Sequence, residues 1–119
     1  MSDQKLFQVT QHDDVTVIHP PTSLGDREQI FEFSDELTKF VDEHKPKKLQ
    51  FNFEYVNFFG TEAISSLIRV QKRVAAYGGR LNLCGMTKDL REIFKILRLD
   101  GPVFHIYSSC RDATAALED

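Results

Sequence analysis

The chain has 119 residues, of which 41% are hydrophobic and 28% charged, and this size fits one domain spanning residues 1–119. No apolar run approaches the roughly 20 residues that cross a bilayer, and the N-terminus lacks the basic-then-apolar order of a signal peptide. We therefore expect a cytoplasmic protein with no direct membrane insertion. Two cysteines, Cys84 and Cys110, give neither a disulfide framework nor a metal-ligand spacing, so both are expected to be reduced thiols.

Basic side chains gather in the C-terminal half of the chain, although the net charge is −3. Residues 1–59 carry 6 basic and 11 acidic side chains, whereas residues 60–119 carry 9 and 7. Two interpretations stay open: the solvated outer faces of two helices, or a docking surface for an acidic partner. The acidic total, and the lack of aromatic residues among the basic ones, disfavour a nucleic-acid surface.

The first third of the chain predicts a hairpin followed by a helix. Val9 and residues 15–18 flank the polar run 11–14, which indicates two short strands joined by a turn. From Asp26, in N-cap position, apolar residues recur at three- and four-residue steps, so a helix of about four turns is expected. Pro46 ends this helix, because proline cannot continue the hydrogen-bond ladder.

The middle of the chain alternates strands with helices. Residues 48–53 alternate apolar and polar side chains and predict a strand. A helical period runs from about residue 62 to the stop at Gly78-Gly79, where glycine supplies a left-handed conformation. A short strand is expected at residues 81–84, and Thr87 starts a further helix.

The C-terminal segment adds one strand, over residues 103–106, and a helix over residues 113–117 that Ser109 caps. His105 is expected on the opposite strand face from Phe104 and Ile106. The order β-β-α-β-α-β-α-β-α indicates an α/β domain with a mixed, mostly parallel, five-stranded sheet and about four helices.

Catalytic and metal-binding patterns are absent from the sequence. The four histidines are scattered, and none has the spacing that lets two ligands reach one ion, so no metal is predicted. The double glycine follows a helix instead of preceding one, so it is no phosphate loop. Neither cysteine has a base nearby in the sequence. We therefore predict a protein that is not an enzyme and that has no cofactor.

The run VNFFGTEAISSLI, residues 56–68, marks the change from a strand to a helix. Thr61 suits the helix start as a capping hydroxyl, and Glu62 suits it as a first-turn anion. A hydroxyl at this corner is also accessible to a kinase, and phosphorylation would add nearly two negative charges. Phe58 and Phe59 alternate along the strand, so either both are buried under loops or one is exposed near Thr61.

The segment Leu49–Leu99 resembles the central part of STAS domains, the bacterial anti-sigma factor antagonists. The shared features are a strand, an Asp-Ser-Ser-Gly-like turn, a helix ending in Gly-Gly, an apolar strand and an amphipathic helix. In that family the hydroxyl after the aspartate is phosphorylated by a partner kinase that is itself the anti-sigma factor, and phosphorylation breaks the complex. Thr61 corresponds to that hydroxyl, Gly60 to the aspartate, Glu62 to the second serine and Ala63 to the glycine.

The resemblance implies an anti-sigma factor antagonist-like regulator that binds an anti-sigma factor/serine kinase, to which ATP and magnesium would belong. The expected partner-binding residues are Gly60, Thr61, Glu62 and Ser65, with Thr61 as the candidate for phosphorylation. Two other functions stay open at this point. One is a STAS-type accessory subunit of a membrane lipid transporter, and the other is a small ligand-binding module or unrecognised enzyme with a deep pocket.

Overall fold

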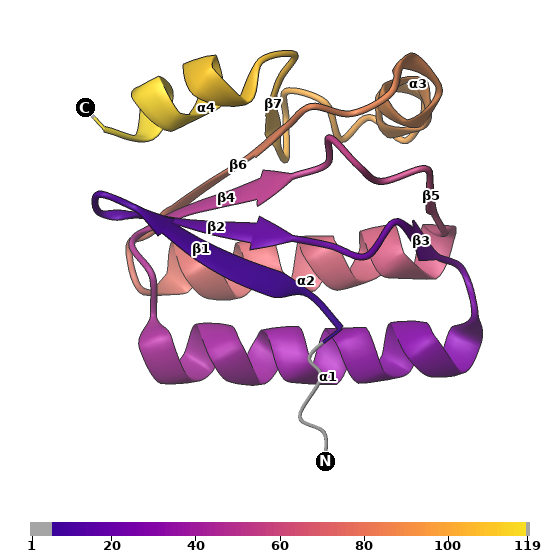
Figure 1. Ribbon diagram of the computed structural model, residues 1–119, viewed down its shortest axis with the longest axis horizontal. Helices are drawn as coiled ribbons and strands as arrows, with labels where there is room; N and C mark the ends of the chain where they lie inside the picture. The colour runs from indigo at the N-terminus through magenta and orange to yellow at the C-terminus, as the bar shows by residue number, and fades with distance from the viewer. Residues whose placement is uncertain (1–5, 119) are drawn as a thin grey trace.

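The computed structural model describes residues 6–118 and contains a mixed sheet with helices on both faces (Figure 1). The sheet has the order β1-β2-β4-β6-β7, in which β1 is antiparallel to β2 and the other neighbours are parallel. Its strands are β1 (Gln8–His12), β2 (Val15–His19), β4 (Lys48–Asn52), β6 (Arg80–Cys84) and β7 (His105–Tyr107). Two further short strands, β3 (Ser23–Leu24) and β5 (Phe58–Phe59), pair with each other.

The helices lie on opposite sides of the sheet (Figure 1). They are α1 (Arg27–His44), α2 (Thr61–Ala76), α3 (Lys88–Ile96) and α4 (Cys110–Leu117). α1 and α2 cover one face, and α4 lies over the other face, with α3 at one end. The predicted α/β class, the mixed five-stranded sheet and the four helices are confirmed. None of the helices within residues 6–118 has the length and apolar character needed to span a bilayer.

Most predicted boundaries hold, and the exceptions lie in the C-terminal segment, where the last helix begins at Cys110, three residues before its predicted start at residue 113. Gly78 has φ 84° and follows α2, as predicted, and Thr87 caps α3 by accepting a hydrogen bond from the Leu90 amide. The last strand begins two residues later than predicted. The amides of Val103 and Phe104 both donate to the carbonyl of Leu99, so this segment is held in a turn and the ladder starts only at His105.

Alternation of side chains gives β4 and β6 one apolar side and one side that carries buried amides. Phe51 and Leu83 are fully buried neighbours on the side of α1 and α2, where the main core lies. Gln50 pairs with Asn82 in the same register and projects to the other side, beneath α4. His105 is exposed while Ile106 is buried, which confirms the predicted orientation of this strand.

Two hydrogen bonds from buried side chains join α4 to the sheet beneath it. The Gln50 side-chain amide donates to Thr114 Oγ1 at 2.7 Å, and the Asn82 amide donates to the carbonyl of Ala113 at 2.8 Å. Both amide side chains are nearly fully buried, at 2% and 3% exposure. Because a buried polar group is costly without a partner, these bonds fix the height and rotation of α4 on the sheet.

The far end of α4 adds a small apolar contact and a charged one. Leu117 packs with Val15 and Val17 in a cluster separate from the main core. The Arg80 guanidinium donates to the Leu117 carbonyl at 2.7 Å, and so satisfies a backbone group at the helix end. α4 therefore spans the sheet from β2 to β7 although it has only eight residues.

An ion pair joins the turn of the β1-β2 hairpin to the start of β4, in addition to the backbone ladder between β2 and β4. Lys48 Nζ donates to Asp14 Oδ2 at 2.8 Å, and this hydrogen bond lowers the pKa of the exposed Asp14 carboxyl.

Two of the basic side chains in the C-terminal half are paired with carboxylates and do not form one continuous cationic surface. On α2, Arg73 contacts both carboxylate oxygens of Asp42 on α1, and Arg91 on α3 contacts Asp100 at 3.1 Å.

The prediction of two reduced thiols is wrong, because Cys84 and Cys110 form a disulfide. Cys84 is the last residue of β6 and Cys110 is the first residue of α4, with Cα atoms 4.9 Å apart. The 26-residue separation carries no local signal for this pairing. The two residues meet because α4 folds back over the sheet after β7. The disulfide thus joins the start of α4 to the strand beneath it.

Replacing Cys110 with Ala tests this cross-link. Loss of a 26-residue loop constraint should lower the free energy of unfolding of the oxidised protein by about 3.5 kcal/mol in the chain-entropy model. Urea denaturation of both proteins, with and without dithiothreitol, measures the effect. With reductant the difference between them should largely disappear. Equal stability without reductant would contradict the assignment.

Candidate functional site

The candidate site is an exposed corner at the start of α2, directly after β5. Gly60 is the N-cap: its amide donates to the Leu24 carbonyl at 2.8 Å, and its own carbonyl accepts from the Ile64 amide at 3.0 Å. The predicted capping role of Thr61 is therefore wrong by one position, because Thr61 is already the first helical residue. Its side chain is exposed, and its hydroxyl has no hydrogen-bond partner within residues 6–118.

Glu62 and Ser65 lie beside Thr61, so the structure brings the four predicted site residues to one corner. Glu62 is in the first turn, as predicted, and its carboxylate lies 3.5 Å from the Arg27 guanidinium at the start of α1. The Ser65 hydroxyl donates to the Thr61 carbonyl at 3.3 Å. Both members of the Arg27–Glu62 pair are more than half exposed, so this contact contributes little to stability.

Gly60 is not required by the backbone at this position. Its φ of −68° is open to any residue, and a Cβ built there would lie 3.4 Å from the Leu24 carbonyl oxygen, at ordinary contact distance. The backbone and the space at this position therefore accept a residue with a Cβ atom. Because glycine has no capping side chain, the amides of the first turn of α2 lack the acceptor that aspartate would supply.

An exposed aromatic side chain borders the corner. Phe59 is buried and packs against Phe33 and Phe53, whereas Phe58 is 55% exposed, so the second of the two sequence alternatives is correct. The Phe58 ring lies over Gly25, where a Cβ would overlap it. Tyr55, in the connection between β4 and β5, is 75% exposed. Gly25 and Arg27 could not be assigned to this corner from the sequence, because only the fold brings them next to it.

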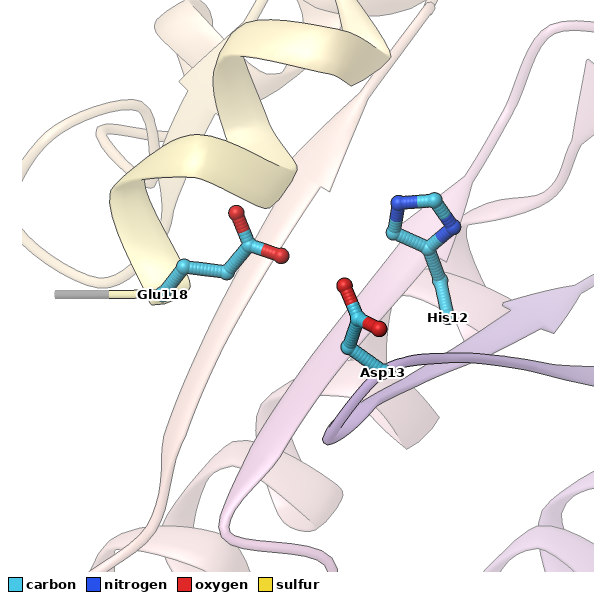
Figure 2. A group of neighbouring side chains, drawn as sticks. All are labelled: His12, Asp13 and Glu118. Atoms are coloured by element: carbon cyan, nitrogen blue, oxygen red, sulfur yellow. The ribbon is translucent and has the colours of Figure 1, made fainter.

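A second group of polar side chains lies at the opposite end of the sheet (Figure 2). His12 and Asp13 from the hairpin approach Glu118 at the end of α4, with one ligand atom from each within 4.8 Å of the others. Spacing within the sequence could not show this group, since Glu118 comes from a distant segment. All three residues are exposed, so burial does not orient them as it orients the ligands of a built metal site.

A cavity of about 520 Å³ lies beside that group, between the hairpin and α4. Its lining includes His12, Val17 and Gln50 from the sheet and Thr114 from α4, and includes none of the predicted site residues. The corner at Thr61 is therefore separate from this cavity. Its chemistry is that of an exposed surface: a free hydroxyl, one ion pair and an aromatic ring.

The sheet order and the helix placement define an α/β domain with the fold of anti-sigma factor antagonists. The STAS domain model matches residues 7–113, and the chain belongs to this family. Its structure is similar to an anti-sigma factor antagonist from Mycobacterium paratuberculosis (TM-score 0.82, 20% identity, 95% of this chain and 93% of that chain covered). It is also similar to an anti-sigma-factor antagonist (STAS) domain protein from Planctomyces limnophilus (0.80, 26%, 93% and 96%).

A further similar structure is the Bacillus cell fate determinant SpoIIAA in its phosphorylated form, with a TM-score of 0.69 and 17% identity. The alignment covers 92% of this chain and 98% of that one. A comparison with curated protein sequences gave no match. At this level of identity the likeness to SpoIIAA concerns the fold alone.

Replacing Gly60 with Asp should stabilise the protein by about 0.3–1 kcal/mol. A carboxylate at the N-cap accepts hydrogen bonds from first-turn amides and interacts favourably with the positive end of the helix dipole. Gly60→Ala is the matched control, since it adds a Cβ but no acceptor. Urea denaturation of the three proteins measures the difference. A stabilisation by Ala as large as that by Asp would show that capping is not the cause.

Proposed function

We propose that this protein is an anti-sigma factor antagonist that binds an anti-sigma factor/serine kinase in the cytoplasm through the corner at Thr61. The observation that carries the proposal is the exposed Thr61 hydroxyl, which has no hydrogen-bond partner in the described chain and stands at the first position of α2 in a STAS fold. A kinase needs such a hydroxyl to be accessible and free to attack the γ-phosphate. Thr61 meets both requirements.

Phosphorylation of Thr61 would change the charge of the corner more than its shape. The dianion would stand beside the amides at the start of α2, which favour negative charge. The phosphate would also lie one residue from Glu62. It would compete with the Glu62 carboxylate for Arg27, whose guanidinium lies 3.5 Å from that carboxylate. The added charge therefore acts mainly on the partner: an interface fitted to a neutral threonine has to desolvate or repel the phosphate.

Phe58 supplies the apolar part of the proposed interface. Its ring is 55% exposed and rests on Gly25, so the ring is held in place before any partner arrives. Aromatic side chains that are ordered and exposed are frequent anchors of protein interfaces. The proposed binding surface thus combines Phe58 with Gly60, Thr61, Glu62 and Ser65.

Phosphate transfer to Thr61 is the first test. Incubation with candidate anti-sigma kinases and ATP, followed by intact-mass measurement and peptide mapping, should show one phosphate on Thr61 and none on Thr61→Ala. Thr10→Ala is the matched control, because Thr10 is an exposed threonine on β1, outside the proposed surface, and this variant should still be phosphorylated on Thr61. In addition, Thr61→Glu should weaken kinase binding roughly tenfold, through an unpaired charge at the interface. Absence of phosphate on Thr61 together with unchanged affinity of Thr61→Glu would refute the switch.

Removing the Phe58 ring tests the apolar part. Phe58→Ala should lower affinity for the kinase about tenfold, as truncation of an interface anchor does, with little effect on folding because the ring lies outside the core. Phe58→Tyr, which keeps the ring, should bind nearly as well as the parent. Isothermal titration calorimetry measures the affinities. Equal binding by all three proteins would place the interface elsewhere.

A further inference from the structure

Three metal-ligating side chains converge between the β1-β2 hairpin and the end of α4. His12 and Asp13 come from the hairpin and Glu118 from α4, and one ligand atom of each lies within 4.8 Å of the other two. In Figure 2 the carboxylates of Asp13 and Glu118 point toward one another, with the His12 ring beside them. None of the three side chains has a hydrogen bond or an ion pair within residues 6–118. Their ligand atoms are therefore available to an ion.

The hairpin positions its two ligands through the backbone, since burial does not orient them. His12 is the last residue of β1, and Asp13 follows it in the turn with φ 56°. The Asp13 carbonyl accepts from the Gln11 side-chain amide at 3.3 Å. Asp14, the other residue of the turn, is bound to Lys48 at 2.8 Å. Because the turn is tied at two points, both ligand side chains leave it from fixed positions.

The end of α4 positions Glu118 in the same way. The Glu118 amide donates to the carbonyls of Thr114 and Ala115 at 3.1 and 3.2 Å. The disulfide holds the start of this helix, and Arg80 binds the Leu117 carbonyl at its end. Ligand atoms about a tetrahedral zinc ion, each roughly 2.1 Å from it, lie about 3.4 Å apart. Exposed side chains can close to that spacing by rotating, without a shift of the backbone.

The other charged and ligating groups near the cluster do not occupy it. Lys48 is engaged in the ion pair at the turn. Arg111, which lines the adjacent cavity, precedes Glu118 by two helical turns, about 10 Å along the helix axis. His19, the other imidazole in that lining, is bonded to Thr10 Oγ1 at 2.9 Å. Two carboxylates thus lie close together without a cation from the described chain, and a divalent ion would balance their charge.

The ligand types select the class of ion. Mg²⁺ and Ca²⁺ prefer shells made of oxygen alone, whereas imidazole suits zinc and its neighbours in the first transition row. We propose that His12, Asp13 and Glu118 bind one divalent transition-metal ion, with water completing the shell as in open zinc sites. The ion joins the hairpin to the end of α4, so its binding stabilises the folded chain. This site is distant from Thr61 and does not depend on the function proposed there.

Isothermal titration with Zn²⁺ tests the site. The parent protein should bind one Zn²⁺ per chain, and His12→Ala should bind it at least roughly tenfold more weakly, since an imidazole ligand is lost. His44→Ala, at an exposed histidine on α1, is the matched control and should bind as the parent does. No binding by the parent, or equal binding by His12→Ala, would overturn the proposal. Equal affinities of the parent for Zn²⁺ and Mg²⁺ would overturn the choice of a transition metal.

The contribution of α4 has a separate test. Zn²⁺ should raise the urea midpoint of the parent and of Glu43→Gln, an exposed carboxylate on α1, but not that of Glu118→Gln. A cooperative urea transition without zinc shows that each variant is folded. In the parent, Zn²⁺ should also shift the ring signals of His12 in two-dimensional NMR spectra. A midpoint of Glu118→Gln that rises with zinc as far as that of the parent would show that α4 supplies no ligand, and would refute the three-residue site.

Discussion

The alternation of side chains along β4 and β6 is the constraint on which the rest of the structure depends. Phe51 and Leu83 face α1 and α2, while Gln50 and Asn82 face α4. A slip of one residue in this register would send the amides into the apolar core and the apolar side chains beneath α4. The same alternation makes the two faces chemically different, because one is covered by apolar packing and the other is joined to α4 by hydrogen bonds, the disulfide and a small apolar cluster.

The corner at Thr61 follows from this arrangement. The chain leaves β4, pairs briefly through β5 with β3, and enters α2 at Gly60, whose amide is bound to Leu24. Burial of Phe59 and Ile64 on either side fixes the start of the helix. Since the N-cap is a glycine, no side chain at that position covers the first turn. The Thr61 hydroxyl therefore stands on a rigid support and stays exposed, as recognition by a partner requires.

The sequence predicted the features that depend on local pattern. The alternation near Phe51, the left-handed Gly78 and the Thr87 cap all follow from residues close together in the chain, and each is observed. Long-range pairs could not be predicted in this way. The disulfide and the contact of Arg27 with Glu62 both depend on how distant segments pack. The boundary at Thr61 was wrong by one residue because glycine and threonine are both acceptable N-caps.

We propose that partner recognition takes place at the Thr61 corner, not on the face that carries α4. Mapping of backbone amide shifts on adding the cognate anti-sigma kinase tests this most directly. The largest shifts should fall on residues 58–65 and near Arg27, with those of α4 unchanged. Shifts concentrated on α4 and the β1-β2 hairpin would contradict it.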